Sequence, residues 1–394
     1  MFGRIANFDN LLKRKGFFLF GPRMTGKSTY LRTMYPDALY LDLLKPAVFR
    51  ELASHPEILE DQVRAHLQKI PSAPVIIDEI QKLPEILDEV HRLTESYRDL
   101  RFILTGSSAR KIKHGGANLL AGRLSWQQFF PIVSAELGDA TDGTSRSWQD
   151  LLRVGGLPAM LSSDAPWDDL RDYIGLYLQE EIQAEGLTRS ISNFSRFLDV
   201  AGACNAEQVN FTAVGNDAQI APRTVHDYFK ILEETLIGTL VPSFQHTSKR
   251  KAISSAKFYL FDVGVANALT GRSDLRPRTA EFGKALEHLI FCELRAYASY
   301  HRKDVNLFYW RTQTQVEVDF VVVPKSGQPL AVEIKASATL MVKDYRGLKA
   351  LSEEVPEIRK IMVAMVSSPR ETADGTQVWP VADFLAQLWQ GAFF

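Results

Sequence analysis

The stretch Gly21-Pro-Arg-Met-Thr-Gly-Lys-Ser28 has the pattern G-x-x-x-x-G-K-S, and it decides how the rest of the chain is interpreted. An apolar run at residues 17–20 precedes it, and residues 29–32 can open a helix, which is the strand–loop–helix context of a phosphate-binding loop. In such a loop, glycines let backbone N–H groups surround a phosphate, and the helix N-terminus attracts its negative charge. A chance glycine-rich turn is the alternative, and the flanking pattern counts against it. The sequence therefore predicts a site for the phosphates of ATP.

A second apolar run, residues 75–77, ends in two carboxylates that suit the chemistry of that site. Lys27 is expected to reach the β and γ phosphates, and the Ser28 hydroxyl to bind Mg²⁺. Asp78 would bind the same ion, and Glu79 would orient and deprotonate the attacking water. A solvated turn is the alternative reading of the two carboxylates, and it is weak beside the first motif. The loop residues expected to contact the nucleotide are Gly21, Pro22, Arg23, Met24, Thr25, Gly26, Lys27, Ser28 and Thr29.

Four more positions are candidates for contact with the nucleotide. Ser107 follows the β-like run 102–104, where a hydroxyl could sense the γ-phosphate. Arg123 and Arg110 are candidates for a finger that enters a neighbouring subunit's site and stabilises the transferring phosphoryl group, with a plain surface or structural role as the alternative for each. Pro158 ends the stretch Gly155-Gly-Leu-Pro158, which on its own indicates only a turn.

The composition is that of a soluble globular protein. The chain is 45% hydrophobic and 24% charged, and no stretch approaches the ~18 uninterrupted apolar residues of a membrane span. Cys204 and Cys292 form no C-x-x-C pair, so we expect neither a disulfide framework nor a zinc site, and we place the chain in the cytoplasm. A net charge of -1 restricts any nucleic-acid contact to a local basic patch.

The 394 residues are enough for two or three domains. Short β-like runs alternate with helical stretches in residues 1–135, which predicts an α/β core with a parallel sheet wrapped by helices. A loop rich in Gly, Asp, Thr and Ser, residues 138–147, marks a boundary. Residues 148–245 are predicted to form a helical lid and winged-helix region, and residues 246–394 a second α/β domain.

Residues 211–240 have the pattern helix, break, helix, which is the helix-turn-helix arrangement. The second helix begins at Pro222, and a strand-like run at 237–241 and a basic segment at 246–251, a candidate wing, follow it. Lys and Arg side chains here could contact DNA phosphates. A packing or protein-contact module is the alternative. The buried face of the second helix is expected to hold Val225, Tyr228, Phe229 and Leu232. Its outward face is expected to hold Arg223, His226, Asp227 and Lys230.

Two alternating runs near the C-terminus, residues 316–323 and 330–335, predict a hairpin centred at Ser326. That register places Asp319 opposite Glu333, close enough for both carboxylates to share Mg²⁺ or Mn²⁺. Lys335 could stabilise charge on a phosphate, and Glu287 could complete the metal shell. A hairpin with one charged solvent face is the alternative. Period-two alternation puts the charged residues Glu317, Asp319, Glu333 and Lys335 on one face. It puts the apolar residues Val318, Phe320, Val332 and Ile334 on the other.

Taken together, these motifs resemble bacterial and archaeal AAA+ ATPases that carry a C-terminal domain of unassigned function. The run that contains Ser107 resembles the sensor strand of AAA+ ATPases, and the stretch that ends at Pro158 resembles their small-lid motif. Residues 121–123, 257–264 and 309–311 also look like motifs of this family. The C-terminal hairpin resembles the core of PD-(D/E)XK nucleases, with Val318 in place of the usual proline. The four positions that match this nuclease site are Glu287, Asp319, Glu333 and Lys335.

Two functions follow as expectations. The first is an enzyme that hydrolyses ATP in order to act on or near DNA, with a metal-dependent nuclease site at the C-terminus. The alternative is a nucleotide-dependent switch or scaffold whose C-terminal domain only binds DNA or protein. A small-molecule kinase is a distant third, because nothing resembles an acceptor site. The candidate arginine fingers imply a homo-oligomer, and no membrane partner is expected.

Overall fold

The computed structural model describes residues 2–108, 122–138, 145–178, 190–245 and 256–394, with side chains of 176–178 left aside. The chain forms two compact units. The first, here called the ATPase unit, consists of Ala6–Phe130 and Glu234–Ile237. The second, here called the C-terminal unit, consists of Met1–Ile5, Pro131–Glu233 and Gly238–Phe394, so it includes both the predicted helical region and the predicted second α/β domain.

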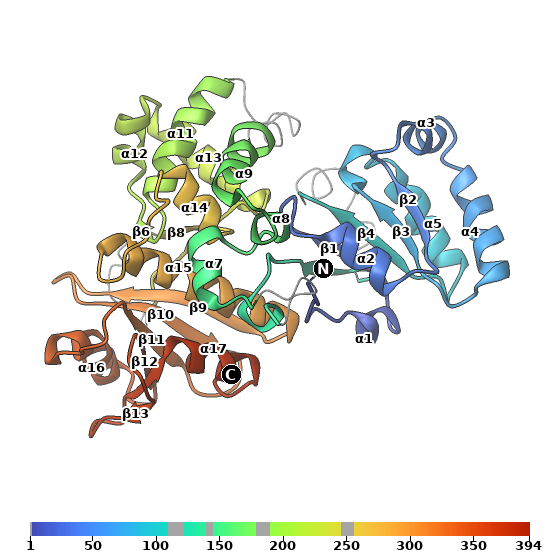
Figure 1. The fold of residues 1–394 in the computed structure, drawn as a ribbon. Helices are drawn as coiled ribbons and strands as arrows, with labels where there is room; N and C mark the ends of the chain where they lie inside the picture. Colours follow the sequence, from blue (N-terminus) through green and yellow to red (C-terminus); the bar gives the residue numbers. More distant parts are fainter. Residues whose placement is uncertain (1, 109–121, 139–144, 179–189, 246–255) are drawn as a thin grey trace. The chain divides into compact units, whose positions relative to one another are not determined.

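A five-stranded parallel sheet is the centre of the ATPase unit (Figure 1). Its strand order is β2-β3-β4-β1-β5, so β4 lies between β1 and β3. The runs predicted as strands at 17–20, 38–41, 75–77 and 102–104 correspond to the first four strands; β1, β3 and β4 are fully buried, whereas β2, at the edge of the sheet, is buried only at Leu41. The strands are β1 Phe17–Phe20, β2 Leu39–Asp42, β3 Val75–Asp78, β4 Phe102–Gly106 and β5 Ser125–Gln128.

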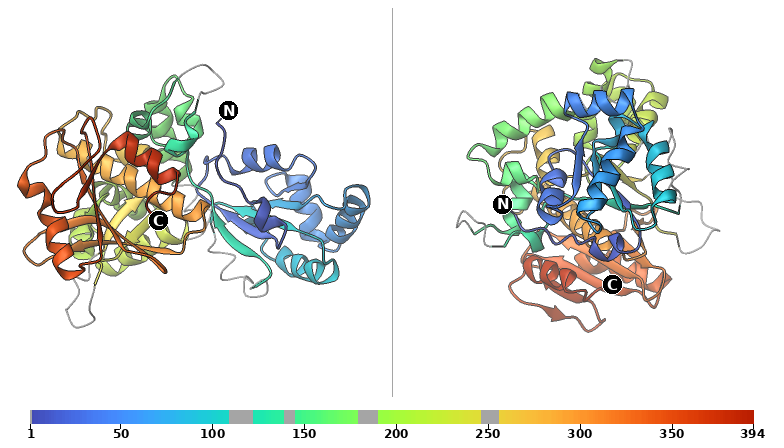
Figure 2. Two further views of the ribbon diagram at one scale, coloured as in Figure 1. Left: turned by 90° about the horizontal axis from the view of Figure 1, so that it is seen from below. Right: turned by 90° about the vertical axis from the view of Figure 1, so that its right-hand side faces the viewer.

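Helices cover both faces of this sheet, drawn in blue in Figure 2. One face packs against α3, α4 and α5, whose apolar side chains join those of β1, β3 and β4 in one buried cluster. The other face packs against α1 and α2, where Phe8 meets Phe17 and Tyr30 meets Phe129 at ring-centroid distances of 5.1 Å. The helices are α1 Asp9–Leu12, α2 Lys27–Met34, α3 Pro46–Ser54, α4 Ile58–Lys69, the 3-10 turn η1 Ile80–Lys82, and α5 Ile86–Ser96.

The C-terminal unit contains a mixed six-stranded sheet in the order β13-β14-β12-β11-β10-β9. Helices α15 and α16 lie on opposite sides of β10 and β11 (Figure 1), and α17 contacts β12, β14 and α15. The strands are β9 Val305–Arg311, β10 Glu317–Pro324, β11 Leu330–Lys335, β12 Arg359–Ala364, β13 Arg370–Glu371 and β14 Gln377–Pro380. The helices are α15 Ala280–Tyr300, the 3-10 turn η5 Val342–Tyr345, α16 Arg346–Glu354 and α17 Val381–Trp389.

The rest of this unit is mostly helical, with a small antiparallel sheet in the order β6-β8-β7. The predicted helix–break–helix pattern is present as α12 Phe211–Ala218 and α13 Pro222–Glu234, and the expected buried and outward faces of α13 are as predicted. The strands are β6 Glu207–Gln208, β7 Gly238–Val241 and β8 Lys257–Leu260. The other helical elements are η3 Ser134–Glu136, α7 Trp148–Val154, α8 Pro158–Leu161, α9 Pro166–Asp172, the π-helical η4 Tyr173–Leu178, α11 Ile191–Ala203 and α14 Val263–Leu269.

Two sequence motifs of the C-terminal unit meet at the buried side chain of Asp262. Its carboxylate caps α14 by accepting from the Val265 N–H at 3.0 Å, and it also accepts from the Gly156 N–H at 2.7 Å. Gly155 has a φ of +78°, and a Cβ there would lie 2.0 Å from Asp262 Oδ1. Glycine is therefore needed at Gly155 both for its backbone conformation and for the close approach of Asp262.

Candidate nucleotide site and carboxylate cluster

The strand order of the ATPase unit brings the predicted nucleotide-site motifs of that unit to one edge of its sheet. The phosphate loop follows β1, Asp78 ends β3, and Ser107 follows β4, which lies between these two strands. Because the carboxyl ends of parallel strands share one edge, the loop, the carboxylates and the serine lie together there. Gly21 lies against the residue that follows β5, so closely that a Cβ on Gly21 would be 2.2 Å from the carbonyl oxygen of Phe129.

The phosphate loop wraps around the ammonium group of Lys27. Its Nζ donates to the carbonyl oxygens of Gly21 at 2.5 Å and Pro22 at 3.0 Å, and the side chain is only 6% exposed. Thr25 closes the loop by donating from Oγ1 to the carbonyl oxygen of Pro22 at 2.9 Å. Gly26 has a φ of +90°, a left-handed conformation that glycine adopts without strain. The loop thus places the positive charge of Lys27 where its backbone turns into α2.

Asp78 is buried and accepts hydrogen bonds from three hydroxyl groups. Ser28 Oγ donates to Oδ2 at 2.8 Å, Thr105 Oγ1 donates to Oδ1 at 2.5 Å, and the hydroxyl of Tyr40 also donates to Oδ2. Burial, and after it the charge of Asp78, raises the pKa of Tyr40, so its phenol stays a donor. The sequence predicted the approach of Ser28 to Asp78, whereas the parts of Tyr40 and Thr105 were not foreseen.

Glu79 stands in a left-handed backbone conformation, with φ +62° and ψ +44°. Its carboxylate accepts from Gln81 Nε2, which also donates to Ser107 Oγ at 3.2 Å. Gly106 leaves room for this amide, because a Cβ there would lie 2.2 Å from Gln81 Oε1. Gln81 therefore connects the expected catalytic base with the expected sensor serine, a role that the sequence did not reveal.

The remaining predicted nucleotide contacts stay predictions. Arg123 pairs with Glu95 of α5, with its Nε 2.7 Å from Glu95 Oε1, on the exposed surface of the ATPase unit. Arg110 lies outside the described residues. Pro158 is the first residue of α8 in the C-terminal unit. Within the loop, Arg23 is half-buried, while Met24 and Thr29 are exposed at the surface.

The magnesium ion expected at the nucleotide site fits the residues in place. Asp78 offers a buried carboxylate, and the Ser28 hydroxyl is already hydrogen-bonded to it. Mg²⁺ in such sites takes one or two protein ligands and completes its shell with phosphate and water oxygens. A single carboxylate beside a serine hydroxyl is therefore a sufficient donor set.

The C-terminal hairpin has the predicted register. Phe320 pairs with Val332, Val321 with Ala331 and Val322 with Leu330, which continues to Asp319 opposite Glu333. Its faces differ from the strict alternation expected. The pairing of β10 with β9 shifts between Val318 and Val321, so Val318 packs with Val321 in one cluster while Phe320 contacts the rings of α15 and β8. A β-bulge is the physical reason for this difference.

The charged residues of the hairpin are not a solvent face. Glu333 is 5% exposed, and the side chains of Glu317 and Asp319 are 24% and 14% exposed. Asp319 accepts from the Ile334 N–H at 2.8 Å, and Lys335 pairs with Glu333. Burial and the neighbouring Asp319 hold the pKa of Glu333 above its usual range. These contacts exclude the reading of the hairpin as an ordinary strand pair with one solvated side.

Lys257, from β8, lies among the four carboxylates of this region. Its Nζ is 2.9 Å from Glu287 Oε1 and 3.8 Å from Asp319 Oδ1, and it pairs with Glu317 at closer range. In the described part of the chain, no three His, Cys, Asp or Glu side chains are arranged to hold a metal ion. The Mg²⁺ or Mn²⁺ site that the sequence suggested for Glu287, Asp319 and Glu333 stays a prediction, and an ion there would lie beside the ammonium of Lys257.

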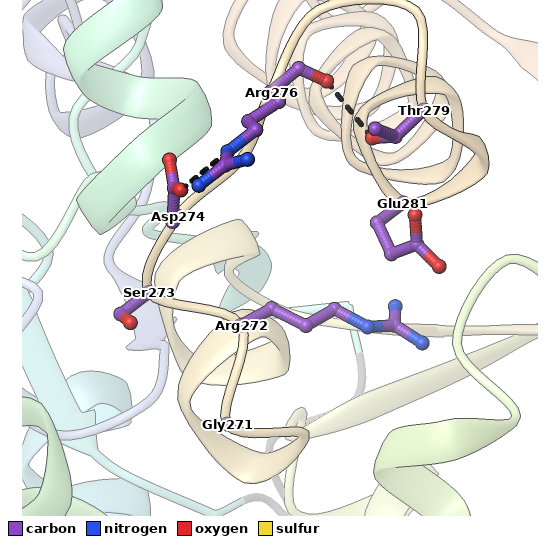
Figure 3. Close-up of a pocket in the computed structure, with 7 residues that line it drawn as sticks. All are labelled: Gly271, Arg272, Ser273, Asp274, Arg276, Thr279 and Glu281. Atoms are coloured by element: carbon purple, nitrogen blue, oxygen red, sulfur yellow. Dashed lines mark hydrogen bonds and ion pairs between the residues drawn. The ribbon is translucent and has the colours of Figure 1, made fainter.

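A pocket of about 360 Å³ lies away from the hairpin residues, where the chain leads from α14 into α15 (Figure 3). Arg276 pairs with Asp274 at 2.7 Å across its rim, while Arg272 and Glu281 stand on the opposite side. Two basic and two acidic side chains give the lining no net preference for an anion or a cation. The lining residues are Gly271, Arg272, Ser273, Asp274, Arg276, Thr279 and Glu281.

Among the described residues, no helix is both long and apolar enough to cross a membrane. Two relatives, the uncharacterized proteins Rv2008c of Mycobacterium tuberculosis and Mb2031c of Mycobacterium bovis, are each 25% identical over 332 residues, which is 82% of this chain and 70% of theirs. The Aeropyrum pernix ORC1 protein in complex with DNA aligns at 14% identity and a TM-score of 0.31, over 68% of this chain and 93% of that one. The Aeropyrum pernix ORC2 protein with ADPNP and ADP aligns at 13% identity and a TM-score of 0.37, over 68% of this chain and 90% of that one.

Family models divide the chain into three parts. Residues 145–276 and 282–384 match two domains of unknown function, DUF8612 and DUF4143. Residues 13–138 match the AAA domain. That match, together with the parallel sheet and the phosphate loop, confirms the predicted P-loop ATPase domain of the AAA type at the N-terminus.

Proposed function

We propose that the chain binds ATP with Mg²⁺ at the phosphate loop and hydrolyses it. The observation that carries this proposal is the hydrogen bond of 2.8 Å between Ser28 and Asp78, beside a loop that encloses Lys27. These groups come from the start of α2 and the end of β3, which are far apart in the sequence, and their proximity supports a shared Mg²⁺. Such an arrangement has no evident use in a purely structural turn.

Each residue has a part in this reaction. Lys27 leaves the carbonyl oxygens of Gly21 and Pro22 and binds the β and γ phosphates, while Ser28 and Asp78 hold the ion. When bound, Mg²⁺ would supply positive charge against the charge that develops on the phosphate oxygens. Glu79 accepts the proton of the attacking water. We propose that Gln81 keeps the Glu79 carboxylate near Ser107 until the nucleotide is bound.

ATP binding and hydrolysis are tested with Lys27→Met. We expect the variant to lose nucleotide binding in a direct titration and to lose ATPase activity, because a neutral side chain cannot replace the charge on the phosphates. Lys69→Met, at the exposed end of α4, is the matched control and should keep both. A folded Lys27→Met that hydrolyses ATP at the rate of the unchanged protein would contradict the proposal.

We further propose that α12, α13 and the sheet β6-β8-β7 form a winged helix that gives the ATPase a DNA partner. The support is the exposed face of α13, which presents Arg223, His226 and Lys230, although Asp227 lies among them. The basic segment 246–251 falls outside the described residues. Measuring ATPase activity against protein concentration, with and without DNA, tests this partner and the homo-oligomer that Arg123 implies, since a flat specific activity would exclude shared sites.

The C-terminal hairpin supports the second of the two expected functions better than the first. A nuclease would need a metal ion between Asp319 and Glu333, and the position of Lys257 argues against one. We therefore propose that the chain is a nucleotide-dependent ATPase whose C-terminal domain binds its partner without cutting it. Incubation of DNA with the protein and Mg²⁺ or Mn²⁺ should leave the DNA intact. Cleavage by the unchanged protein that is lost in Asp319→Ala would restore the nuclease assignment.

A further inference from the structure

The carboxylates near the hairpin are arranged around one ammonium group. Lys257 is 3% exposed, and its Nζ lies within 4 Å of carboxylate oxygens of Glu287, Glu317 and Asp319. The three acids come from α15 and β10, while the lysine comes from β8 of the small sheet. Three elements, β8, α15 and β10, therefore meet at a single positive charge, and Glu333 stands opposite Asp319 on β11, the other strand of the hairpin.

We propose that the ammonium of Lys257 is the built-in cation of this carboxylate cluster, so that the cluster holds no divalent metal ion. A buried carboxylate is stable only when it is paired or hydrogen-bonded, and several of them in one place repel each other. A metal ion can supply the missing positive charge in such a site. Here a covalently attached group supplies it.

The backbone of Lys257 is fixed in its sheet, so the side chain enters the cluster from a defined position. β8 is the middle strand of its sheet, and Lys257 pairs with Val241 on one side and Gln208 on the other. Tyr259, two residues further along the same strand, donates its hydroxyl to Glu287 Oε1. One strand thus delivers two hydrogen-bond donors to the same glutamate oxygen.

The pairing of the other groups leaves little for a metal ion. Arg311 Nη1 is 3.1 Å from Glu317 Oε2, and Lys335 pairs with Glu333 Oε1. Three basic side chains therefore face four carboxylates. Glu333 Oε2 is buried without a hydrogen-bond partner. Mg²⁺ can be held by one or two carboxylates and water, but an ion bound here would lie beside the ammonium of Lys257, which contacts three of the four acids and repels a second cation.

The rival interpretation keeps Lys257 as a second lysine beside a metal ion. It requires Glu287, Asp319 and Glu333 to turn their oxygens away from the ammonium and toward the ion, at ligand distances of about 2.0 to 2.1 Å for Mg²⁺. The two interpretations differ in whether the unchanged protein binds a divalent ion in a way that depends on Asp319. This difference does not involve the phosphate loop, so it can be tested apart from the ATPase.

Binding of Mn²⁺ to the nucleotide-free, full-length chain decides between them, measured by electron paramagnetic resonance of the free ion. The quantity of interest is the Mn²⁺ binding that is lost in Asp319→Asn. This variant removes the carboxylate charge but keeps an oxygen that can accept from the Ile334 N–H. We expect no such binding in the unchanged protein. We expect Lys257→Met to gain Asp319-dependent binding, at least roughly tenfold tighter than any in the unchanged protein. Lys257→Arg, which keeps the positive charge, is the matched control and should stay free of metal.

Asp319-dependent Mn²⁺ binding by the unchanged protein would overturn the proposal, and so would a folded Lys257→Met that gains none. If Lys257→Met does not fold, the comparison of the unchanged protein with Asp319→Asn still decides: equal Mn²⁺ binding supports the built-in cation, and a loss of binding in Asp319→Asn refutes it. Failure of the Lys27→Met test would leave this result untouched, because the two sites lie in separate units.

Discussion

Tyr40 is the residue at the nucleotide site whose removal tests the geometry most directly. Tyr40→Phe takes away only the hydroxyl that donates to Asp78 Oδ2, the oxygen that also accepts from Ser28. The ring can keep its place, since the Arg32 guanidinium lies 3.9 Å from its centroid. Asp78 is 3% exposed, so water has little access to replace the lost donor.

The size of the effect follows from the charge of the acceptor. A hydrogen bond to a charged group contributes about 1.5 to 3 kcal/mol, and Asp78 keeps its bonds to Ser28 and Thr105 in the variant. We therefore take the lower end, about 1.5 kcal/mol, which corresponds to roughly a tenfold change in an equilibrium constant. The carboxylate then has one contact fewer that holds it at the metal position.

The assay is ATP hydrolysis against Mg²⁺ concentration at saturating ATP. We expect Tyr40→Phe to need roughly ten times more Mg²⁺ for half-maximal activity, while nucleotide binding without Mg²⁺ stays the same. Tyr35→Phe is the matched control, because Tyr35 also donates to an aspartate of the ATPase unit, Asp9, at 3.1 Å. An unchanged Mg²⁺ dependence in Tyr40→Phe, or an equal shift in Tyr35→Phe, would refute the reasoning.

Two further predictions concern the stability of the C-terminal unit. Gly155→Ala should lower the free energy of unfolding by about 2 to 5 kcal/mol, because its φ is +78° and a Cβ would lie 2.0 Å from Asp262. Gly271→Ala is the control: at φ +66° with open space around it, this change should cost only about 1 to 2 kcal/mol. Both are measured by urea unfolding. Equal losses would contradict the contact with Asp262. Burial raises the pKa of Glu293 from 4.5 to about 7, so the folded chain holds a proton that the unfolded chain releases, and stability falls as pH rises through this window. Glu293→Gln should remove roughly 3 kcal/mol of the loss in unfolding free energy between pH 4.5 and pH 7. If the free energy of urea unfolding falls with pH as steeply in the variant as in the unchanged protein, Glu293 is not the responsible group.

The parts of the nucleotide site that follow from sequence are those that lie within one motif. The loop residues up to Ser28 act together because they are contiguous, and Asp78 ends a run that is apolar enough to be a buried strand. Tyr40 carries no such signal. Its contact with Asp78 exists because β2 pairs with β3, placing Leu41 beside Ile77, and strand order is not encoded in the local pattern of either run.

The carboxylate cluster divides in the same way. The register of the hairpin was predictable because the turn between its strands fixes it, and Asp319 and Glu333 stand where that symmetry puts them. The bulge near Val318 was not predictable, because the residue pattern alternates regularly through it. Lys257 offered a signal that is clear afterwards: a lysine that opens an otherwise apolar strand, two residues from Tyr259 and therefore on the same face.

The cluster and the chain connections to the ATPase unit share one helix, α15. Glu293 accepts from the Ser134 N–H at 2.7 Å, the Ser134 hydroxyl at 2.8 Å and Trp389 Nε1 at 2.6 Å, and it lies nearly two helical turns after Glu287. The segment that contains Ser134 begins where the chain leaves the ATPase unit. Glu136, at its end, pairs with Arg4 at 3.1 Å, just before the chain enters that unit. Two of the four chain crossings, those next to Ile5 and Pro131, are therefore anchored, directly or through Glu136, to the helix that presents Glu287 to Lys257. Glu287, which meets Lys257, and Glu293, which holds the segment around Ser134, are therefore fixed relative to each other by one helix of the C-terminal unit.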